Sequence, residues 1–280
     1  MKKCFWIFPV LLIGFLSSAS ASDIPSHPLL EQARQAKLER FNYALQHGAK
    51  IELTPDGKTF FLLWYPSSKV PGKPVPMFAG LHGHGSWAFD EFFLWHDALE
   101  KRGCGILAIQ WWLGGDESAE GYLRPREIYK ILDQTFHREG VQPGTVLLHG
   151  FSRGSANTYP VAALDTYTQN RYFALIIANS GKANADYPPV HEIIQGTYGE
   201  KPFEGTHWAT FAGGKDPHPE RDGIQGMREA GKFIEQYGGT VDLAIEDPSQ
   251  GHGGFHRNPA NTEKALDLFA QKLAENSPAN

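Results

Sequence analysis

The sequence has little cysteine: its 280 residues include 2, Cys4 and Cys104. Cys4 lies in an N-terminal segment that we expect to be removed, and Cys104 stands in the apolar run Cys-Gly-Ile-Leu-Ala-Ile. Removal of that segment leaves Cys104 alone, which excludes an intramolecular disulfide. We therefore expect Cys104 to be a buried, inert thiol. The fold must then depend on a core that is stable without cross-links, which a chain of this length can form.

The sequence also lacks a cluster of basic residues. Its formal net charge is −5, and Lys and Arg form no block. Proteins that bind nucleic acid gather positive charge on one face, so we expect no nucleic-acid partner. Hydrophobic residues make up 41% and charged residues 20%, the balance of a globular protein rather than a disordered one. Repeats, low-complexity segments and linkers are absent from the sequence, which predicts a single domain over residues 22–280.

No apolar run is long enough to indicate a clear membrane span. The longest extends from residue 4 to 16 and is interrupted by Pro9 and Gly14. Met-Lys-Lys precedes it and the small residues 17–21 follow it, which is the pattern of a cleavable signal peptide. A membrane anchor is the alternative. We predict a signal peptide over residues 1–21 and a secreted or periplasmic protein with no stable membrane anchor.

Short apolar segments alternate with amphipathic ones along the remaining chain. We expect strands at 51–53, 59–65, 77–81, 105–111, 145–150, 172–178, 208–212 and 241–245. We expect helices at 28–46, 87–101, 124–138, 223–236 and 262–275. A further helix should follow Ser152 and reach about Tyr159, where Pro160 kinks or interrupts it. Residues 187–198 should be irregular with one or two helical turns. This alternation predicts an α/β fold, a mostly parallel central sheet with helices on both faces.

The most informative motif is Gly150-Phe151-Ser152-Arg153-Gly154, which follows an apolar run. A strand, a sharp turn and a helix are expected there, with Ser152 at the apex of the turn. The glycines leave room for a chain that crowds itself at this turn. The following helix would direct its first N–H groups at whatever the serine hydroxyl attacks. An ordinary turn serine is the alternative.

Polar groups follow four of the expected strands. His82–Gly85, Ser152, Asp216 and His252 each lie in a loop that leaves a strand end. In parallel sheets such loops meet at the carboxyl edge, where functional groups gather. The four loops therefore predict one site that combines an oxyanion loop, a nucleophile, an acid and a base.

The chain resembles an α/β-hydrolase, and is most similar to the secreted esterases related to polyhydroxybutyrate depolymerases and feruloyl esterases. The resemblance covers roughly Ile51 to Ala274. It rests on four motifs: His82-Gly83-His84-Gly85, Gly150-Phe151-Ser152-Arg153-Gly154, Gly214-Lys215-Asp216 and Gly251-His252-Gly253. The family order of Ser, then Asp, then His is met.

Physical requirements assign a role to each group. Ser152 needs a base to take its proton, and a histidine such as His252 fits this role, because imidazole as a group has its pKa near working pH. Asp216 would accept a hydrogen bond from the other imidazole nitrogen, with Asp222 as the reserve acid. The backbone N–H of Arg153 would donate to the oxyanion, and His84 is chosen as the second donor.

Several of these residues have other interpretations. His252 can be a surface-loop histidine and Asp216 a helix N-cap. His82 and His84 can be read as zinc ligands, although no third ligand stands near them. Trp111 and Trp112 would floor an acyl or aromatic pocket, or else pack in the core. Arg153 can pack over its helix rather than contact substrate.

The sequence therefore predicts a secreted serine hydrolase that cleaves a small-molecule or polymeric ester through an acyl-enzyme. We expect neither a cofactor nor a metal. Two other functions remain open: a peptidase of the prolyl-oligopeptidase kind, and an inactive binding protein on a hydrolase fold. The sequence does not indicate the oligomeric state.

Overall fold

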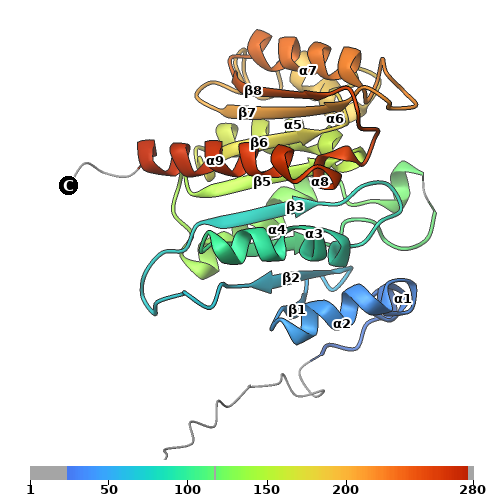
Figure 1. The fold of residues 1–280 in the computed structure, drawn as a ribbon, viewed down its shortest axis with the longest axis vertical. Helices are drawn as coiled ribbons and strands as arrows, with labels where there is room; N and C mark the ends of the chain where they lie inside the picture. Colours follow the sequence, from blue (N-terminus) through green and yellow to red (C-terminus); the bar gives the residue numbers. More distant parts are fainter. Residues whose placement is uncertain (1–23, 117, 277–280) are drawn as a thin grey trace, which may run out of the picture.

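The computed structural model describes residues 24–116 and 118–276, so the predicted signal peptide lies outside the described residues. An eight-stranded sheet runs through the molecule, in the order β1-β2-β4-β3-β5-β6-β7-β8 (Figure 1). The strands are β1 (Lys50–Leu53), β2 (Phe60–Trp64), β3 (Met77–Leu81), β4 (Gly105–Ile109), β5 (Val146–Phe151), β6 (Phe173–Asn179), β7 (His207–Gly213) and β8 (Thr240–Asp247). Strand β2 pairs antiparallel with β1 and with β4, and every other pairing is parallel.

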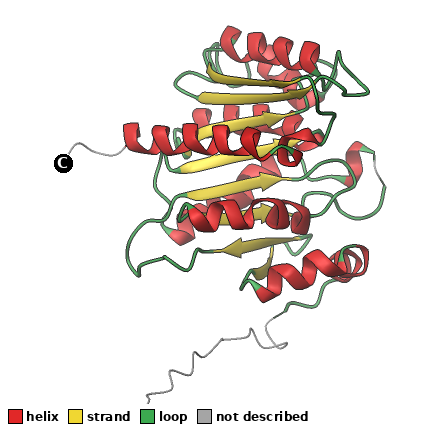
Figure 2. Cartoon of the chain, viewed as in Figure 1, coloured by secondary structure: helices red, strands yellow, loops and turns green. Residues whose placement is uncertain are grey.

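Helices cover both faces of the sheet, as Figure 2 shows. The helices are α1 (Pro28–Ala36), α2 (Leu38–Gln46), α3 (Ala88–Lys101), η2 (Ala119–Gly121), α4 (Pro125–Glu139), α5 (Arg153–Thr168), α6 (Pro188–Ile194), α7 (Ile224–Gln236), α8 (Gly254–Arg257) and α9 (Pro259–Asn276). Helix α3 contacts α8 through Trp95 and Phe255, on one face. Helices α5 and α7 meet on the other face through Tyr159 and Phe233. The predicted α/β fold is thus confirmed.

The core lies in the central strands. Every residue of β3, β4 and β6 is buried, as expected of parallel strands covered on both faces. Cys104 is also buried, and burial raises the pKa of its thiol to about 11. No helix among the described residues is long and apolar enough to span a bilayer.

Two predicted helix boundaries were wrong. The helix predicted over 28–46 is two helices, because the backbone of Lys37 leaves the helical region at φ −138° and ψ 46°. The helix after Ser152 does not end at Tyr159 but continues through Pro160 to Thr168. Most of α5 is buried, including Pro160, so its packing outweighs the penalty of about 3 kcal/mol for an internal proline.

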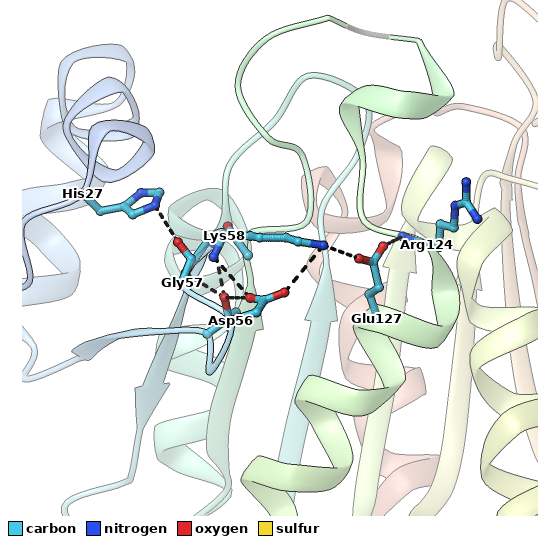
Figure 3. A network of polar contacts seen from close by, with 8 residues as sticks. His27, Asp56, Gly57, Lys58, Arg124 and Glu127 are labelled. Carbon is cyan, nitrogen blue, oxygen red and sulfur yellow. Dashed lines mark hydrogen bonds and ion pairs between the residues drawn. The ribbon is translucent and has the colours of Figure 1, made fainter.

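The turn of the β1–β2 hairpin ties the N-terminal helices to the sheet (Figure 3). His27 Nε2 lies 3.0 Å from the carbonyl oxygen of Gly57. Lys58 Nζ lies 2.9 Å from Glu127 Oε1, and Glu127 Oε2 accepts the N–H of Arg124 at the start of α4. This hairpin therefore joins α1 to α4, next to the loops at the carboxyl edge of the sheet.

Candidate active site

Ser152 lies at the sharp turn between β5 and α5. Its backbone has φ 54° and ψ −115°, a conformation that residues with a side chain rarely adopt. Gly154 is required at this turn, because a Cβ there would lie 2.1 Å from the carbonyl oxygen of Leu81. The predicted strand, turn and helix are present, and the turn presents the Ser152 side chain at the carboxyl edge of the sheet.

The structure brings Ser152, His252 and Asp216 together in one hydrogen-bonded chain. His252 Nε2 lies 2.8 Å from Ser152 Oγ, and His252 Nδ1 lies 2.7 Å from Asp216 Oδ2. An ionised carboxylate only accepts hydrogen bonds, so Nδ1 carries the imidazole proton and Nε2 is left to accept from the serine hydroxyl. The three side chains come from loops after β5, β7 and β8, as the loop order predicted.

Asp216 and His252 differ in how far their side chains are exposed to solvent, and the difference suits His252 to act as a base. The Asp216 side chain is fully buried, whereas 30% of the His252 side chain is exposed. The second oxygen of Asp216, Oδ1, accepts the backbone N–H of His218 at 2.9 Å, which fixes the carboxylate. Phe151 packs against the His252 ring with centroids 5.0 Å apart. The imidazole is thus held on one side and open to solvent on the other.

Asp247, which the sequence did not single out, holds the loop that carries His252. Its Oδ1 accepts from the N–H and hydroxyl of Ser249, and its Oδ2 accepts from the side chains of Asn258 and Asn261. These hydrogen bonds hold the pKa of Asp247 well below its usual range. The acid at the end of β8 therefore anchors both ends of the loop from 248 to 258.

The two histidines of the loop after β3 have different surroundings. His82 is fully buried, and burial lowers its pKa to about 4, so it is neutral at ordinary pH. Its Nδ1 lies 2.8 Å from the carbonyl oxygen of Gly83. His84 Nδ1 lies 3.3 Å from Tyr122 Oη and 3.1 Å from Arg153 Nη1. The imidazole rings of His82 and His84 therefore contact different groups, rather than sharing one site as two zinc ligands would.

Tyr122 fixes the loop that was predicted to supply an oxyanion donor. Its hydroxyl accepts the backbone N–H of Gly85 at 2.9 Å. The guanidinium of Arg153 lies over the Tyr122 ring, 3.8 Å from its centroid. Arg153 thus packs on an aromatic ring while its backbone N–H belongs to the first turn of α5, where N–H groups point out of the helix. No pattern in the sequence indicated Tyr122, because it comes from an irregular loop.

A cavity of about 510 Å³ adjoins this loop. Arg153 lines it, together with aromatic and proline side chains from three segments: Trp111, Tyr122, Pro125, Tyr187, Pro188 and Pro189. Lys58 and Glu127 also line it. Figure 3 shows the ion pair between them. Trp112 is absent from this lining and packs against Trp87, with centroids 5.0 Å apart. Of the two tryptophans predicted to floor a pocket, Trp111 lines the cavity and Trp112 belongs to the packing behind it.

One group of side chains in the described part of the chain is spaced closely enough to hold a cation. It consists of Asp216, Asp222 and His252, whose ligand atoms lie within 4.8 Å of one another. His252 Nδ1 and Asp216 Oδ2 are already bonded to each other. A proton relay between Asp216 and His252 therefore accounts for the short distance between these two side chains.

No protein-family model and no curated protein matches the sequence. Solved structures do match the fold. An esterase structure from Rhizomucor miehei has a TM-score of 0.60 at 15% identity, over 89% of this chain and 92% of that one. A Thermogutta terrifontis esterase has a TM-score of 0.56 at 15% identity, over 81% and 92%. A 2,6-dihydroxy-pseudo-oxynicotine hydrolase has a TM-score of 0.61 at 14% identity, over 87% and 74%.

Identities this low carry information about architecture alone. The sheet of eight strands, parallel except at β1 and β2, and the helices on both of its faces agree with these neighbours. The protein therefore has the α/β-hydrolase fold.

Proposed function

We propose that the protein is a serine hydrolase that cleaves carboxylic esters through an acyl-enzyme intermediate. The observation that carries this proposal is the hydrogen-bonded chain from Asp216 through His252 to Ser152, at 2.7 and 2.8 Å. A serine hydroxyl is a weak nucleophile until a neighbouring base takes its proton. His252 is placed to do so at the moment when Ser152 attacks.

In the first half-reaction, Ser152 Oγ bonds to the ester carbonyl carbon while its proton passes to His252 Nε2. The carbonyl oxygen becomes an oxyanion, and the imidazole becomes an imidazolium stabilised by Asp216. When the tetrahedral intermediate collapses, the bond from carbon to the alcohol oxygen breaks. The alcohol leaves with the proton from His252, and the acyl group stays on Ser152.

In the second half-reaction, water replaces the alcohol. His252 takes a proton from the water, which attacks the acyl carbon, and the proton then returns to Ser152 Oγ as the acid leaves. Every proton moves between substrate, water, Ser152 and His252, so the proposed chemistry requires no cofactor.

The oxyanion would be stabilised by two backbone donors. The N–H of Arg153 is one, because it follows the nucleophile at the N-terminus of α5. His84 is the proposed second donor, from the loop that Tyr122 holds. Loss of one such donor typically costs about 3–4 kcal/mol of transition-state stabilisation.

Hydrolysis of a panel of p-nitrophenyl acyl esters tests the proposal. The panel should vary acyl chain length and aromaticity, since the cavity of about 510 Å³ beside Arg153 is the proposed seat of part of the ester. A proline-containing peptide amide is the comparison substrate. Turnover of the esters well above that of the amide supports the proposal. Preference for the amide would indicate a peptidase, and turnover of neither would indicate a binding protein.

We also propose that the protein is exported, on the basis of the N-terminal pattern. Lys2 and Lys3, an apolar run and a small-residue site ending at Ala21 are the features of a cleavable signal. The N-terminus of the mature protein tests this proposal. It should begin at Ser22, whereas an intact Met1 on the exported or retained protein would contradict cleavage.

A further inference from the structure

A second buried carboxylate lies beside the relay of Ser152, His252 and Asp216. Asp222 is 4% exposed, and one of its oxygens lies within 4.8 Å of the ligand atoms of both Asp216 and His252. Its neighbour Gly223 packs against Asp216: a Cβ on Gly223 would lie 3.2 Å from Asp216 Cβ. Two acids thus flank one imidazole, although a single acid suffices for the relay.

The backbone around Asp222 is held without its side chain. The carbonyl oxygen of His218 accepts the N–H groups of Arg221, Asp222 and Gly223, at 3.1, 2.8 and 3.1 Å. His218 is in turn fixed by its own N–H, which donates to Asp216 Oδ1. The loop from 216 to 223 is therefore held by backbone hydrogen bonds to His218 and by the Asp216 side chain, and this geometry brings the Asp222 carboxylate to the relay.

Within the described residues, the hydrogen bonds to the Asp222 carboxylate come from Arg221. Arg221 Nε and Nη2 both donate to Asp222 Oδ2, at 2.8 and 2.6 Å. The Arg221 side chain is 56% exposed, so it compensates the buried charge from the solvent side. Both hydrogen bonds from Arg221 go to Oδ2, so neither occupies Oδ1 of Asp222.

We propose that Asp222 is a positioning residue, a second acid of the relay; this inference rests on the proposed function. With Asp216 in place, Asp222 adds negative potential where the imidazolium of His252 forms. When Asp216 is lost, Asp222 accepts the hydrogen bond from His252 Nδ1 and keeps the proton on that nitrogen. The proton of Ser152 still goes to Nε2, and no proton passes to either aspartate.

Substitution of the two acids, singly and together, tests the inference by kcat and KM. Loss of the acid from a serine triad costs about 3 × 10⁴ in kcat where nothing replaces it. We expect Asp216→Ala to lose only roughly 10- to 100-fold, since Asp222 takes over, and Asp216→Ala/Asp222→Asn to approach the full loss. Asp222→Asn alone should lower kcat several-fold and leave KM unchanged. Asp267→Asn, which removes the distant ion pair with Arg102, is the matched control and should leave both constants unchanged.

A second measurement is independent of turnover. The ¹⁵N chemical shifts of the His252 imidazole report which nitrogen carries the proton. Asp216→Ala should keep the proton on Nδ1, and the double variant should lose that preference, in protein whose thermal melt shows that it is folded.

Two results would overturn the inference: a full loss of activity in Asp216→Ala that the second substitution does not deepen, or a tautomer unchanged between the single and double variants. If the wild type hydrolyses no ester, the proposed function fails, and the ¹⁵N shifts still decide the relation between Asp222 and His252.

Discussion

The backbone N–H of Ser152 donates a hydrogen bond to the carbonyl oxygen of Asn179, at 2.8 Å, between the ends of neighbouring parallel strands. Ser152 has a positive φ of 54°, a conformation that costs about 1–3 kcal/mol and persists only where its surroundings impose it. The Asn179 side chain lies 3.2 Å from His149 Nε2, and His149 Nδ1 lies 2.9 Å from Glu91 Oε2. The buried side chains of Asn179, His149 and Glu91 thus form a hydrogen-bonded series that supports the strained backbone of Ser152.

The close approach of α5 to the end of β3 predicts the effect of Gly154→Ala. The new Cβ would lie 2.1 Å from the Leu81 carbonyl oxygen and 2.6 Å from that of His82. Both are backbone atoms, so the helix start must shift and carry Ser152 with it. We expect a loss of about 1–3 kcal/mol in the free energy of unfolding, measured in urea, together with most of the ester turnover.

Gly231→Ala is the matched control, because Gly231 lies inside α7 with nothing nearer to its Cβ position than 3.8 Å. This variant should gain up to about 1 kcal/mol, since alanine favours a helix interior over glycine. Equal changes in the free energy of unfolding and in ester turnover for Gly154→Ala and Gly231→Ala would show that the contact of α5 with β3 is not tight.

A second prediction concerns the hydroxyl of Tyr122. Tyr122→Phe removes the acceptor of the Gly85 N–H and loosens the loop that carries His84. Because a misplaced donor stabilises the oxyanion less, kcat should fall roughly tenfold while KM changes little. Tyr129→Phe, which removes a buried hydroxyl bonded to Asp165 far from the loop, should lower stability and leave kcat unchanged. A kcat for Tyr122→Phe equal to that of wild type would remove this loop from the proposed oxyanion site.

Asp165 predicts how stability depends on pH. Burial raises its pKa to about 6 from an ordinary value of 3.8. Between these pH values Asp165 keeps a proton in the folded protein that it releases in the unfolded chain, so its contribution to the free energy of unfolding falls as pH rises from about 4 to 6 and is level above. The contribution is about 3 kcal/mol.

Asp165→Asn removes this dependence. Its stability relative to wild type should therefore be greater at pH 7 than at pH 4, by about 2–3 kcal/mol in urea unfolding. Asp186→Asn, at an exposed aspartate, should show no such difference. If the difference in the free energy of unfolding between Asp165→Asn and wild type is the same at pH 4 and pH 7, the pKa of Asp165 is not raised.

Much of the fold could be predicted because buried parallel strands are continuous apolar runs. Met77–Leu81 is the strand β3 as expected, and β5 to β8 lie within a few residues of the predicted ranges. The errors arose where packing overrides local preference. Pro160 was expected to interrupt α5, yet the helix continues because its neighbours bury it, and the break at Lys37 has no glycine or proline to announce it.

The site could be predicted to the extent that its residues sit next to strand ends. Ser152, Asp216 and His252 were placed by glycine-rich loops after apolar runs, and the structure brings them together. Tyr122 and Asp247 were missed, because their roles depend on how two irregular loops fold over the sheet. The spacing of residues along a single sequence does not indicate how such loops fold.

Covalent labelling with a fluorophosphonate is the sharpest test of Ser152 as a nucleophile, since it requires an activated serine and no knowledge of the substrate. We expect one adduct per chain, mapped by peptide mass to Ser152, and no adduct on Ser152→Ala. His252→Ala should label more slowly by several orders of magnitude, because its serine lacks a base. Wild-type protein that stays unlabelled, or a Ser152→Ala variant that still takes the label, would show that Ser152 is not an activated nucleophile.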